Sequence, residues 1–450
     1  MSVSEVPAAM PLHEDGAACS TGQALSLDEA AGREPTRQLL KVTPGPLADA
    51  QYEQLAAIFR PVFAQIAAGA KDRELNRVLP FEAVGLLNRE RFGALRLPVA
   101  AGGYGARLSD VFRLLIELAE ADSHVAQLWR AHIAFVEDVL RLDDQQLQAK
   151  WISRLAAGQI VGNAYTEPSG GTPGVLKTVA IQDGGRWLVN GEKFYCTGTI
   201  FADWTTVAAG REGFEGRHIA VVSTQHSGVK ILDDWDGFGQ GLTGTGTTVF
   251  TNVPVDTFMP QDANDPEAAI FQLVLMAVQA GIGRAALNDM RISVQARTRS
   301  FTTGTGVPVH REPQVLQLVG EVSAEVFAAE SVVIGAVLEV ESALADPGLN
   351  AEERYAVCEL AANRAQTIVQ PLVISATSKL FDGLGASSTR ISCSLDRHWR
   401  NARTIATHNP AIYKARIVGD YEINGVQPQR LSVTGGFADP QAHINNTQGE

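Results

Sequence analysis

Apolar residues recur three and four positions apart over about residues 48–158, and this spacing predicts a first region built of helices. Within it, the stretch 109–142 is predicted to form two helices, with Ser109 as the N-cap of the first. The helical spacing returns after Pro266 and continues to about residue 421. The chain therefore has two predicted helical regions with a different pattern between them.

The middle of the chain, about 161–260, alternates apolar and polar residues, which predicts strands. Turn residues at Asp183–Gly185 and Asn190–Gly191 predict hairpins. The order helical, small β, helical predicts an α+β protein. The predicted domains are a tail (1–45), an N-terminal helical domain (46–160), a β domain (161–262), a C-terminal helical domain (263–425) and a second tail (426–450).

Composition narrows the class of protein. Of 450 residues, 45 % are apolar and 19 % are charged, an ordinary globular mixture, and the net charge of −13 argues against nucleic-acid binding. The four cysteines are widely spaced without a CxxC pair, so reduced thiols are expected and no metal site. The run 268–283 contains two glutamines and is predicted to be a buried core helix, not a membrane span. No secretory signal is visible, so a cytoplasmic protein is expected.

Two segments carry candidate chemistry. In NAYTEPSGGTPG (163–174), glycines permit close backbone approach, and the Thr166 and Thr172 hydroxyls suit polar ring edges or a phosphate. In NGEKFYCTGTIFADW (190–204), an aromatic ring stands beside hydroxyls, which suits a flat heterocycle. Its polar positions are predicted to share one strand face: Tyr195, Thr197 and Thr199. A plain glycine-rich turn and a half-buried strand are the alternatives. No GxGxxG fingerprint supports a nicotinamide site.

Together these segments resemble the acyl-CoA dehydrogenase superfamily. TEPSGGTP (166–173) resembles its flavin loop and NGEKFYCTG (190–198) its later strand, while 237–255 and 296–322 resemble two further blocks. The resemblance covers roughly residues 50–420. It implies an N-terminal α-helical domain, a middle β-barrel domain, a C-terminal four-helix bundle, a homotetramer, and a flavin between the β domain and the bundle.

The resemblance also implies roles for single residues. Thr197 would meet the flavin ring near N5, Tyr195 would flank the ring, and Thr166 and Thr172 would line the loop over it. Arg297 and Arg299 would reach the flavin phosphate, of a neighbouring subunit; solvated helix charges are the alternative. The loop holds Pro173 where the family has Asp, and the block after residue 296 departs from its pattern. FMN is therefore expected, with FAD as the alternative.

The position of the dehydrogenase base decides between reactions. Removing a proton α to a thioester needs a carboxylate, but the matching position holds Asn409, preceded by His408. The other family position, in helix 268–283, also lacks a carboxylate. The segments 397–414, 128–135 and 162–167 resemble the flavin-dependent monooxygenase branch, which includes the dibenzothiophene and related sulfur-compound monooxygenases.

That branch implies a two-component enzyme. A separate NAD(P)H-dependent reductase would supply reduced flavin, and O₂ would form a C4a-hydroperoxyflavin that oxygenates a small substrate, first of all at sulfur. Candidate catalytic residues are His408, His132, Asn409 and Asn163. A structural role is the alternative for each. N-oxygenation, aromatic hydroxylation, an acyl-CoA dehydrogenase with a displaced base and a non-catalytic flavin-binding module stay open.

Overall fold

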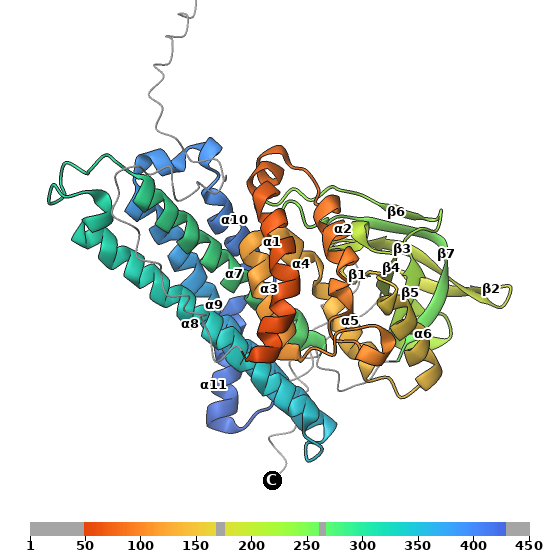
Figure 1. Cartoon of the computed structure of the whole chain (residues 1–450). Helices are drawn as coiled ribbons and strands as arrows, with labels where there is room; N and C mark the ends of the chain where they lie inside the picture. Colours follow the sequence, from red (N-terminus) through yellow and green to blue (C-terminus); the bar gives the residue numbers. More distant parts are fainter. Residues whose placement is uncertain (1–48, 168–175, 261–266, 429–450) are drawn as a thin grey trace, which may run out of the picture. The chain divides into compact units, whose positions relative to one another are not determined.

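The computed structural model describes residues 49–167, 176–260 and 267–428 (Figure 1). The first region is helical, as predicted, and its α-helices are α1 (Ala50–Asn76), α2 (Phe81–Arg89), α3 (Leu108–Ala121), α4 (Ser123–Leu128), α5 (Arg130–Leu140) and α6 (Gln145–Ala156), with short 3₁₀ turns η1 (Phe92–Ala94) and η2 (Val99–Ala101). The apolar faces of these helices form one core together with helices of the third region. Phe59, Leu115 and Trp129 of the first region belong to this core, each at 2 % exposure or less.

The stretch 109–142 forms three helices, not the two that its spacing predicted. Asp122 causes the extra break: its backbone is extended, and its carboxylate accepts the His124 N–H at 3.0 Å, which starts α4. The predicted N-cap at Ser109 is also wrong. Ser109 is buried inside α3, and the Asp110 carboxylate accepts the backbone N–H of Arg107, the residue that precedes the helix.

The middle region is a small closed barrel, as expected. Its strands are β1 (Val161–Ala164), β2 (Val179–Asp183), β3 (Arg186–Lys193), β4 (Trp204–Arg211), β5 (Phe214–Ser223), β6 (Val229–Ile231) and β7 (Thr248–Met259), with the 3₁₀ turn η3 (Thr199–Phe201) between β3 and β4. Pairing runs β4–β2–β3–β7–β5 and returns from β5 to β4, which closes the ring. β1 adds to β4 in parallel, and β6 adds to β7.

One predicted hairpin is confirmed and the other is wrong. β2 and β3 pair antiparallel around Gly184 and Gly185, both in the left-handed region. Asn190–Gly191 does not turn: it lies inside β3, where the pairing with β7 shifts register at a bulge. A Cβ on Gly191 would lie 2.5 Å from the Thr178 hydroxyl, so only glycine fits.

The strand β3 ends at Lys193, so the expected single face for Tyr195, Thr197 and Thr199 does not exist. Tyr195 adopts a left-handed φ of 57°, which turns the chain, and Thr199 begins η3. The turn exposes the Tyr195 side chain and buries both threonines. Apolar and polar residues continue to alternate after Lys193 in the sequence, but the strand ends where its pairing with β7 ends.

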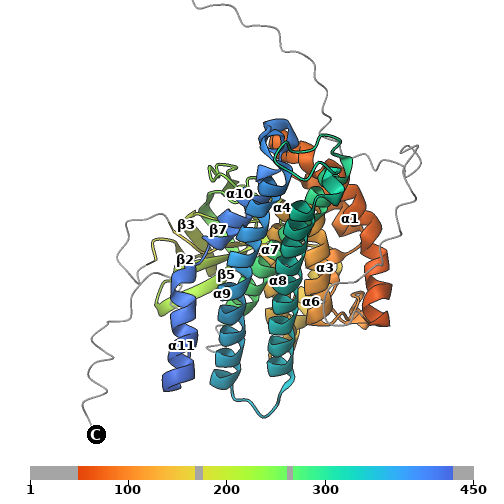
Figure 2. The same cartoon turned by 90° about the vertical axis from the view of Figure 1, so that its left-hand side faces the viewer.

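The third region is helical, with α7 (Glu267–Ala296), α8 (Pro313–Ala345), α9 (Ala351–Leu384), α10 (Asp396–Ala406), α11 (Lys414–Asn424) and the 3₁₀ turns η4 (Val309–Arg311), η5 (Ala386–Thr389), η6 (Ile391–Cys393) and η7 (Ala411–Tyr413). The long helices α7, α8 and α9 pack on one another, and α10 packs on α7 and α9 to complete the bundle (Figure 2). α7 is long and apolar enough to cross a membrane by composition, yet 83 % of that window is buried inside the protein. It is the core helix that the sequence predicted.

Candidate active site

A buried ion pair anchors the end of β1 against β3. Lys193 is fully buried, and its ammonium donates to the Glu167 carboxylate at 2.8 Å and to the Tyr165 carbonyl at 3.3 Å. Glu167 also accepts the backbone N–H groups of Lys177 and Thr178, at 2.9 and 2.8 Å. Burial alone would raise the pKa of Glu167, but the Lys193 hydrogen bond and the backbone donors lower it to about 2. Glu167 thus holds together the two flanks of segment 168–175.

One of the two predicted flavin-loop hydroxyls, that of Thr166, belongs to a residue in this neighbourhood. Thr166 is exposed, and its carbonyl accepts the backbone N–H of Phe194 at 2.7 Å, which joins β1 to the turn after β3. Thr172 lies outside the described residues. The two sequence motifs therefore contact each other through Thr166 and Phe194.

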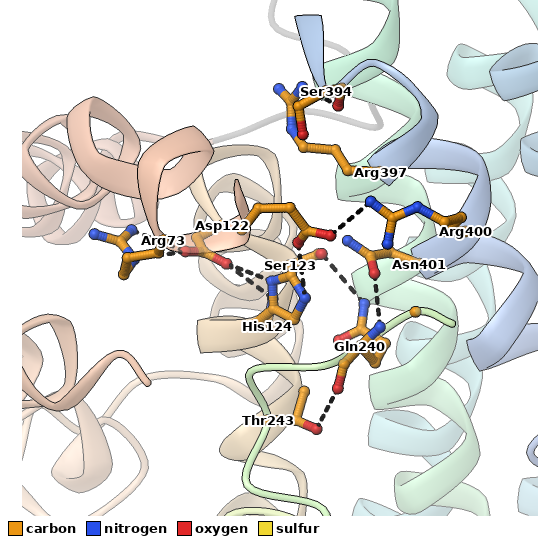
Figure 3. Close-up of polar contacts among 12 residues, drawn as sticks. Arg73, Asp122, Ser123, His124, Gln240, Thr243, Ser394, Arg397, Arg400 and Asn401 are labelled. Atoms are coloured by element: carbon orange, nitrogen blue, oxygen red, sulfur yellow. Dashed lines mark hydrogen bonds and ion pairs between the residues drawn. The ribbon is translucent and has the colours of Figure 1, made fainter. Parts of the chain in front are cut away.

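A chain of threonine hydroxyls runs inward from the turn after β3. The Thr197 hydroxyl oxygen lies 2.7 Å from that of Thr245, which lies 2.8 Å from that of Thr243. Thr243 donates to the Gln240 carbonyl at 2.9 Å. Gln240 in turn donates from its side chain to Ser123 and from its backbone to Asn401, at 3.2 and 2.6 Å (Figure 3). The chain ties Thr197 to α4 and α10.

Tyr195 stands beside this buried chain as an open aromatic surface. Its side chain is 53 % exposed, and its ring meets that of Trp235 edge to face at 5.9 Å. An exposed ring next to a buried hydroxyl is a suitable wall and edge partner for a flat heterocycle. Tyr195 and Thr197 are therefore neighbours through a turn and not through a strand face, and their contact with a flavin stays a prediction.

A polar network around Gln240 joins the helical regions. The Glu74 carboxylate binds Arg400 of α10 at 2.9 Å and lies 3.2 Å from the His124 ring. The other ring nitrogen of His124 lies 3.2 Å from Asp122, which pairs with Arg73 at 2.8 Å (Figure 3). All these charges are paired, so the network has a structural role in holding α1, α4 and α10.

Arg130 of α5 projects into the region between the helices. It is 9 % exposed, its Nε donates to the Phe271 carbonyl at 3.2 Å, and its guanidinium lies 4.4 Å from the centre of the Phe271 ring. Burial lowers the pKa of Arg130 to about 10, so the side chain remains a cation at neutral pH. Among the residues that the structure describes, none forms an ion pair with it.

His408, the first catalytic candidate, follows α10 and faces Arg130. Its Nε2 lies 3.2 Å from the Arg130 Nη1. Water reaches the side chain, but surrounding protein removes most solvent from the ring, and this desolvation together with the Arg130 charge lowers the pKa of His408 to about 3. The ring is therefore neutral at pH 7. Because arginine only donates, Nε2 is the acceptor and Nδ1 carries the hydrogen.

Asn409 is held next to this pair by its backbone. Its carbonyl accepts the Gln366 side-chain amide of α9 at 3.1 Å, and Gln366 is itself buried. His408 and Asn409, both named from the sequence, therefore lie in one segment beside Arg130, and their catalytic roles stay a prediction. Arg130 itself was missed; the signal was a lone cation inside the apolar run LWRAHIAF.

A carboxylate also lies in this region, contrary to expectation. The helix expected to lack one begins at Glu267, a single residue before the run 268–283. Tyr165 donates its hydroxyl to Glu267 at 2.9 Å, and the Tyr165 ring meets Phe271 edge to face at 6.2 Å. Glu267 is thus a site residue that sequence reasoning missed, because the apolar pattern of the helix starts after it.

His132 is a residue of α5 whose ring contacts the start of β1, and Asn163 lies within β1. His132 is buried; its Nε2 lies 2.9 Å from the Gly93 carbonyl, and its Nδ1 accepts the Val161 N–H at 3.2 Å. Burial lowers the pKa of His132 to about 4, and both ring nitrogens are already used, which favours a structural role. Asn163 is buried with its side-chain oxygen unpaired among the described residues, while its carbonyl accepts the Thr199 hydroxyl at 3.1 Å.

The two arginines predicted for a phosphate lie in the loop after α7. Arg297 donates to the Leu384 carbonyl at the end of α9 and to the Arg299 carbonyl at 3.1 Å, and it covers the Phe301 ring at 4.1 Å. Arg299 is exposed. These contacts leave the phosphate role a prediction that no contact within this chain tests.

Comparisons with known proteins agree on one family. Residues 162–253 match the acyl-CoA dehydrogenase middle domain, and residues 273–411 match the acyl-CoA dehydrogenase C-terminal domain. The probable FMNH₂-dependent monooxygenase SfnC of Pseudomonas putida is 26 % identical over 83 % of this chain and 95 % of its own. A dibenzothiophene monooxygenase of Mycolicibacterium goodii is 26 % identical over 74 % of this chain and 85 % of its own.

Solved structures give the same result. TdsC from Paenibacillus sp. A11-2, in complex with FMN and indole, superposes with a TM-score of 0.77 at 25 % identity, over 86 % of this chain and 99 % of that chain. Methanesulfinate monooxygenase MsuC from Pseudomonas fluorescens superposes with a TM-score of 0.76 at 28 % identity, over 86 % and 99 %. The chain belongs to the acyl-CoA dehydrogenase superfamily, in the branch of its flavin-dependent monooxygenases.

Proposed function

We propose that this flavin-dependent monooxygenase is a two-component enzyme that oxygenates a small sulfur compound. A separate NAD(P)H-dependent reductase supplies its reduced FMN, and O₂ supplies the oxygen. The observation that carries the proposal is the constellation beside Arg130: a neutral His408 and, at the position of the dehydrogenase base, Asn409. Sulfur substrates are named for two of the most similar proteins, dibenzothiophene and methanesulfinate.

FMN is the cofactor, and the residues present fit its ring. Tyr195 offers an exposed aromatic face, Thr197 a buried hydroxyl, and Asn163 a buried side-chain oxygen without a partner among the described residues. An unpaired buried oxygen is costly unless a ligand donates to it. We infer that Tyr195 and Thr197 hold the flavin ring, that Thr166 and Thr172 belong to the loop over it, and that Arg297 and Arg299 reach a phosphate. The relatives named FMNH₂-dependent or solved with FMN favour FMN over FAD.

Reduced FMN, when bound, would supply the oxidising chemistry with O₂, as a C4a-hydroperoxyflavin that would oxygenate the sulfur. The chain's own residues create the conditions for this chemistry. His408 is neutral, so its Nδ1–H can donate a hydrogen bond without adding a charge. Asn409 cannot act as a base, so it does not remove a proton from the flavin. The Phe271 ring lies against the Arg130 guanidinium and the Tyr165 ring packs on Phe271, so apolar walls cover one side of this cation.

N-oxygenation is the second candidate. The L-evernosamine nitrososynthase of a Micromonospora strain is 24 % identical over 78 % of this chain and 85 % of its own. That protein shares the branch, and its name describes oxidation at nitrogen. The distal oxygen of the same flavin adduct can pass to an amine lone pair, so substrate selection alone separates the two reactions.

Glu267 keeps a dehydrogenase with a displaced base open as a further candidate. Its carboxylate lies at the start of α7 and accepts the Tyr165 hydroxyl at 2.9 Å. A carboxylate that takes up a substrate proton must be free to accept it, whereas this hydrogen bond stabilises the charged form. We therefore place oxygen transfer first. We also propose a cytoplasmic homotetramer, as the superfamily resemblance implies.

Rapid mixing of the FMNH₂-loaded protein with O₂ tests the proposal. A C4a adduct that forms and outlives free reduced FMN under the same conditions supports oxygen transfer. Reoxidation at the rate of free FMNH₂, with no adduct in the presence or absence of methanesulfinate and dibenzothiophene, contradicts it. Oxidation of an acyl-CoA with an artificial electron acceptor would instead support the dehydrogenase.

A further inference from the structure

Arg130 is a buried cation whose charge the described residues leave unpaired. Its Nε and Nη1 are used by the Phe271 carbonyl and by His408, both of which are uncharged. The nearby Glu267 stabilises the cation at longer range, but the Tyr165 hydroxyl already binds that carboxylate. Removing a charge from water costs free energy that an anion at short distance offsets. The guanidinium therefore has the charge and the free N–H groups to take an anion.

Two other shielded arginines of this chain have a carboxylate partner, which Arg130 lacks among the described residues. Arg73 binds Asp122 at 2.8 Å, and Arg284 binds Glu120 at 2.8 Å. Their side chains are 17 % and 22 % exposed, so both are less buried than Arg130, at 9 %. The Phe271 carbonyl and His408, the hydrogen-bond partners of Arg130, are both uncharged, so its charge is available to a ligand.

The groups around Arg130 indicate the chemical class of that ligand. On one side the Phe271 ring lies against the guanidinium, and the Tyr165 ring packs on Phe271. On another side His408 is neutral and has its Nδ1–H available as a further donor. Donors with one positive charge beside aromatic walls suit a compact oxyanion that carries a small apolar group.

Resting on the proposed function, we propose that Arg130 binds the oxyanion of a small alkanesulfinate, so that this enzyme selects anionic sulfur substrates over neutral thiophenes and sulfones. Arg130 is then the residue that determines specificity. His408 is a positioning residue that holds one N–H of the guanidinium and leaves the others for the substrate.

The reaction balances with the co-substrates of the proposed function. The sulfinate sulfur uses its lone pair to form a new S–O bond while the O–O bond breaks, and R–SO₂⁻ becomes R–SO₃⁻. Sulfur gives two electrons and reduced FMN gives two, which together reduce O₂. The second oxygen atom leaves as water with the two protons that the flavin carried. Substrate and product are both anions, so Arg130 stays paired throughout.

The anion that meets Arg130 has two possible sources, a substrate or an anionic part of FMN itself, and binding measurements separate them. Methanesulfinate and its uncharged counterpart of similar size, dimethyl sulfone, are titrated into the protein loaded with oxidised FMN, where no turnover occurs. FMN is titrated separately into the cofactor-free protein. The wild-type protein is expected to bind methanesulfinate at least tenfold more tightly than dimethyl sulfone. Equal affinities would overturn the proposal without any variant.

Variants of Arg130 test whether this residue causes the preference for the anion. Arg130→Gln removes the charge and is expected to weaken methanesulfinate binding by about 30-fold or more, since losing one partner of a buried charge pair costs about 2 kcal/mol or more. Arg130→Lys keeps the charge and should retain most of the preference for the anion. Arg311→Gln, which removes an exposed arginine, is the matched control and should change neither affinity.

The outcomes distinguish the substrate role of Arg130 from the proposed function on which it rests. Unchanged methanesulfinate binding in Arg130→Gln overturns the substrate role. Loss of FMN binding with unchanged methanesulfinate binding assigns the charge to the flavin and also overturns it. A wild-type protein that binds methanesulfinate through Arg130 but forms no flavin adduct with O₂ would instead contradict the proposed function and leave the anion site in place.

Discussion

The hydroxyl oxygen of Thr197 lies 2.7 Å from that of Thr245, and this contact fixes the direction in which Thr197 can bind a ligand. Thr243 gives its single hydroxyl hydrogen to the Gln240 carbonyl, so it must accept from Thr245. Thr245 must then accept from Thr197. The hydrogen of Thr197 is used within the chain of hydroxyls, and only its oxygen lone pairs remain for the proposed contact with the flavin.

Changing Thr245 to valine should weaken the preference for reduced flavin. N5 of reduced flavin carries a hydrogen, which Thr197 can accept, whereas N5 of oxidised flavin needs a donor. Thr245→Val frees the Thr197 hydrogen to serve the oxidised form. We expect the affinity ratio of reduced over oxidised FMN to fall about tenfold, which lowers the midpoint potential of bound FMN by about 30 mV. An anaerobic redox titration measures it.

The control lies in the same loop. Thr247 donates its hydroxyl to Asp234 at 2.7 Å and takes no part in the chain. Thr247→Val should leave the potential unchanged, and Thr245→Ser, which keeps a hydroxyl, should restore it. An equal shift in Thr247→Val and Thr245→Val would assign the effect to a looser loop. It would contradict the claim that Thr245 fixes the hydrogen-bond direction of Thr197.

Removing the charge of Glu167 should destabilise the protein and change its response to acid. Glu167→Gln leaves the fully buried Lys193 without its anion, and breaking such a pair costs about 3 kcal/mol in the free energy of unfolding. Urea unfolding at neutral pH measures this loss. Glu82→Gln on the exposed face of α2 is the control and should behave as wild type.

The pH dependence has a defined sign. The pKa of Glu167 is lowered from 4.5 to about 2 in the folded protein, so its stabilising contribution is present above about pH 4.5 and is lost as the pH falls towards 2. The stability difference between wild type and Glu167→Gln should therefore shrink across this window. A constant difference from pH 6 to pH 2.5 would show that Glu167 has an ordinary pKa.

The two candidate histidines should respond in opposite ways. His132→Ala leaves the Gly93 carbonyl and the Val161 N–H unpaired in a buried place, which costs about 2 kcal/mol or more in stability. Activity per folded molecule should stay near wild type. His408→Ala, at a water-accessible position, should keep its melting temperature and lose activity. A catalytic defect in His132→Ala at unchanged stability would reverse these assignments.

Much of the fold was predictable from local pattern. The helical and β regions and the Gly184–Gly185 hairpin follow from spacing and turn chemistry alone. The errors occur where tertiary contacts override that pattern. Asp122 breaks a continuous apolar helix because its carboxylate accepts the His124 N–H, and Gly191 lies at a bulge where Thr178 leaves no room for a Cβ. A single sequence shows neither contact.

The site was predictable only in part, and for a similar reason. His408, Asn409 and Thr197 lie in segments with a family pattern. Arg130 and Glu267 lie inside or beside apolar helical runs, where the surrounding pattern hides them. Their importance depends on which groups they meet across the bundle, and those partners are more than 100 residues away in the sequence.

Restoring a carboxylate at position 409 should damage oxygen transfer. Asn409→Glu places a base where the dehydrogenases of the superfamily have one, and loss of the flavin N5 proton releases H₂O₂ from the adduct. We expect a shorter adduct lifetime and more H₂O₂ per FMNH₂ consumed. Asn409→Gln, which adds the same length without the charge, should resemble wild type. Equal lifetimes in the three proteins would remove the role given to this position.

The most direct test of oxygen transfer is a single turnover under ¹⁸O₂. The protein loaded with FMNH₂ is mixed with methanesulfinate and ¹⁸O₂, and mass spectrometry measures the ¹⁸O content of the methanesulfonate product. One ¹⁸O atom per product molecule, formed with the wild-type protein and not with free FMNH₂, is the predicted result. Formation of oxidised FMN and H₂O₂ without any labelled product would contradict the account, if it holds for methanesulfinate, for dibenzothiophene and for amine substrates.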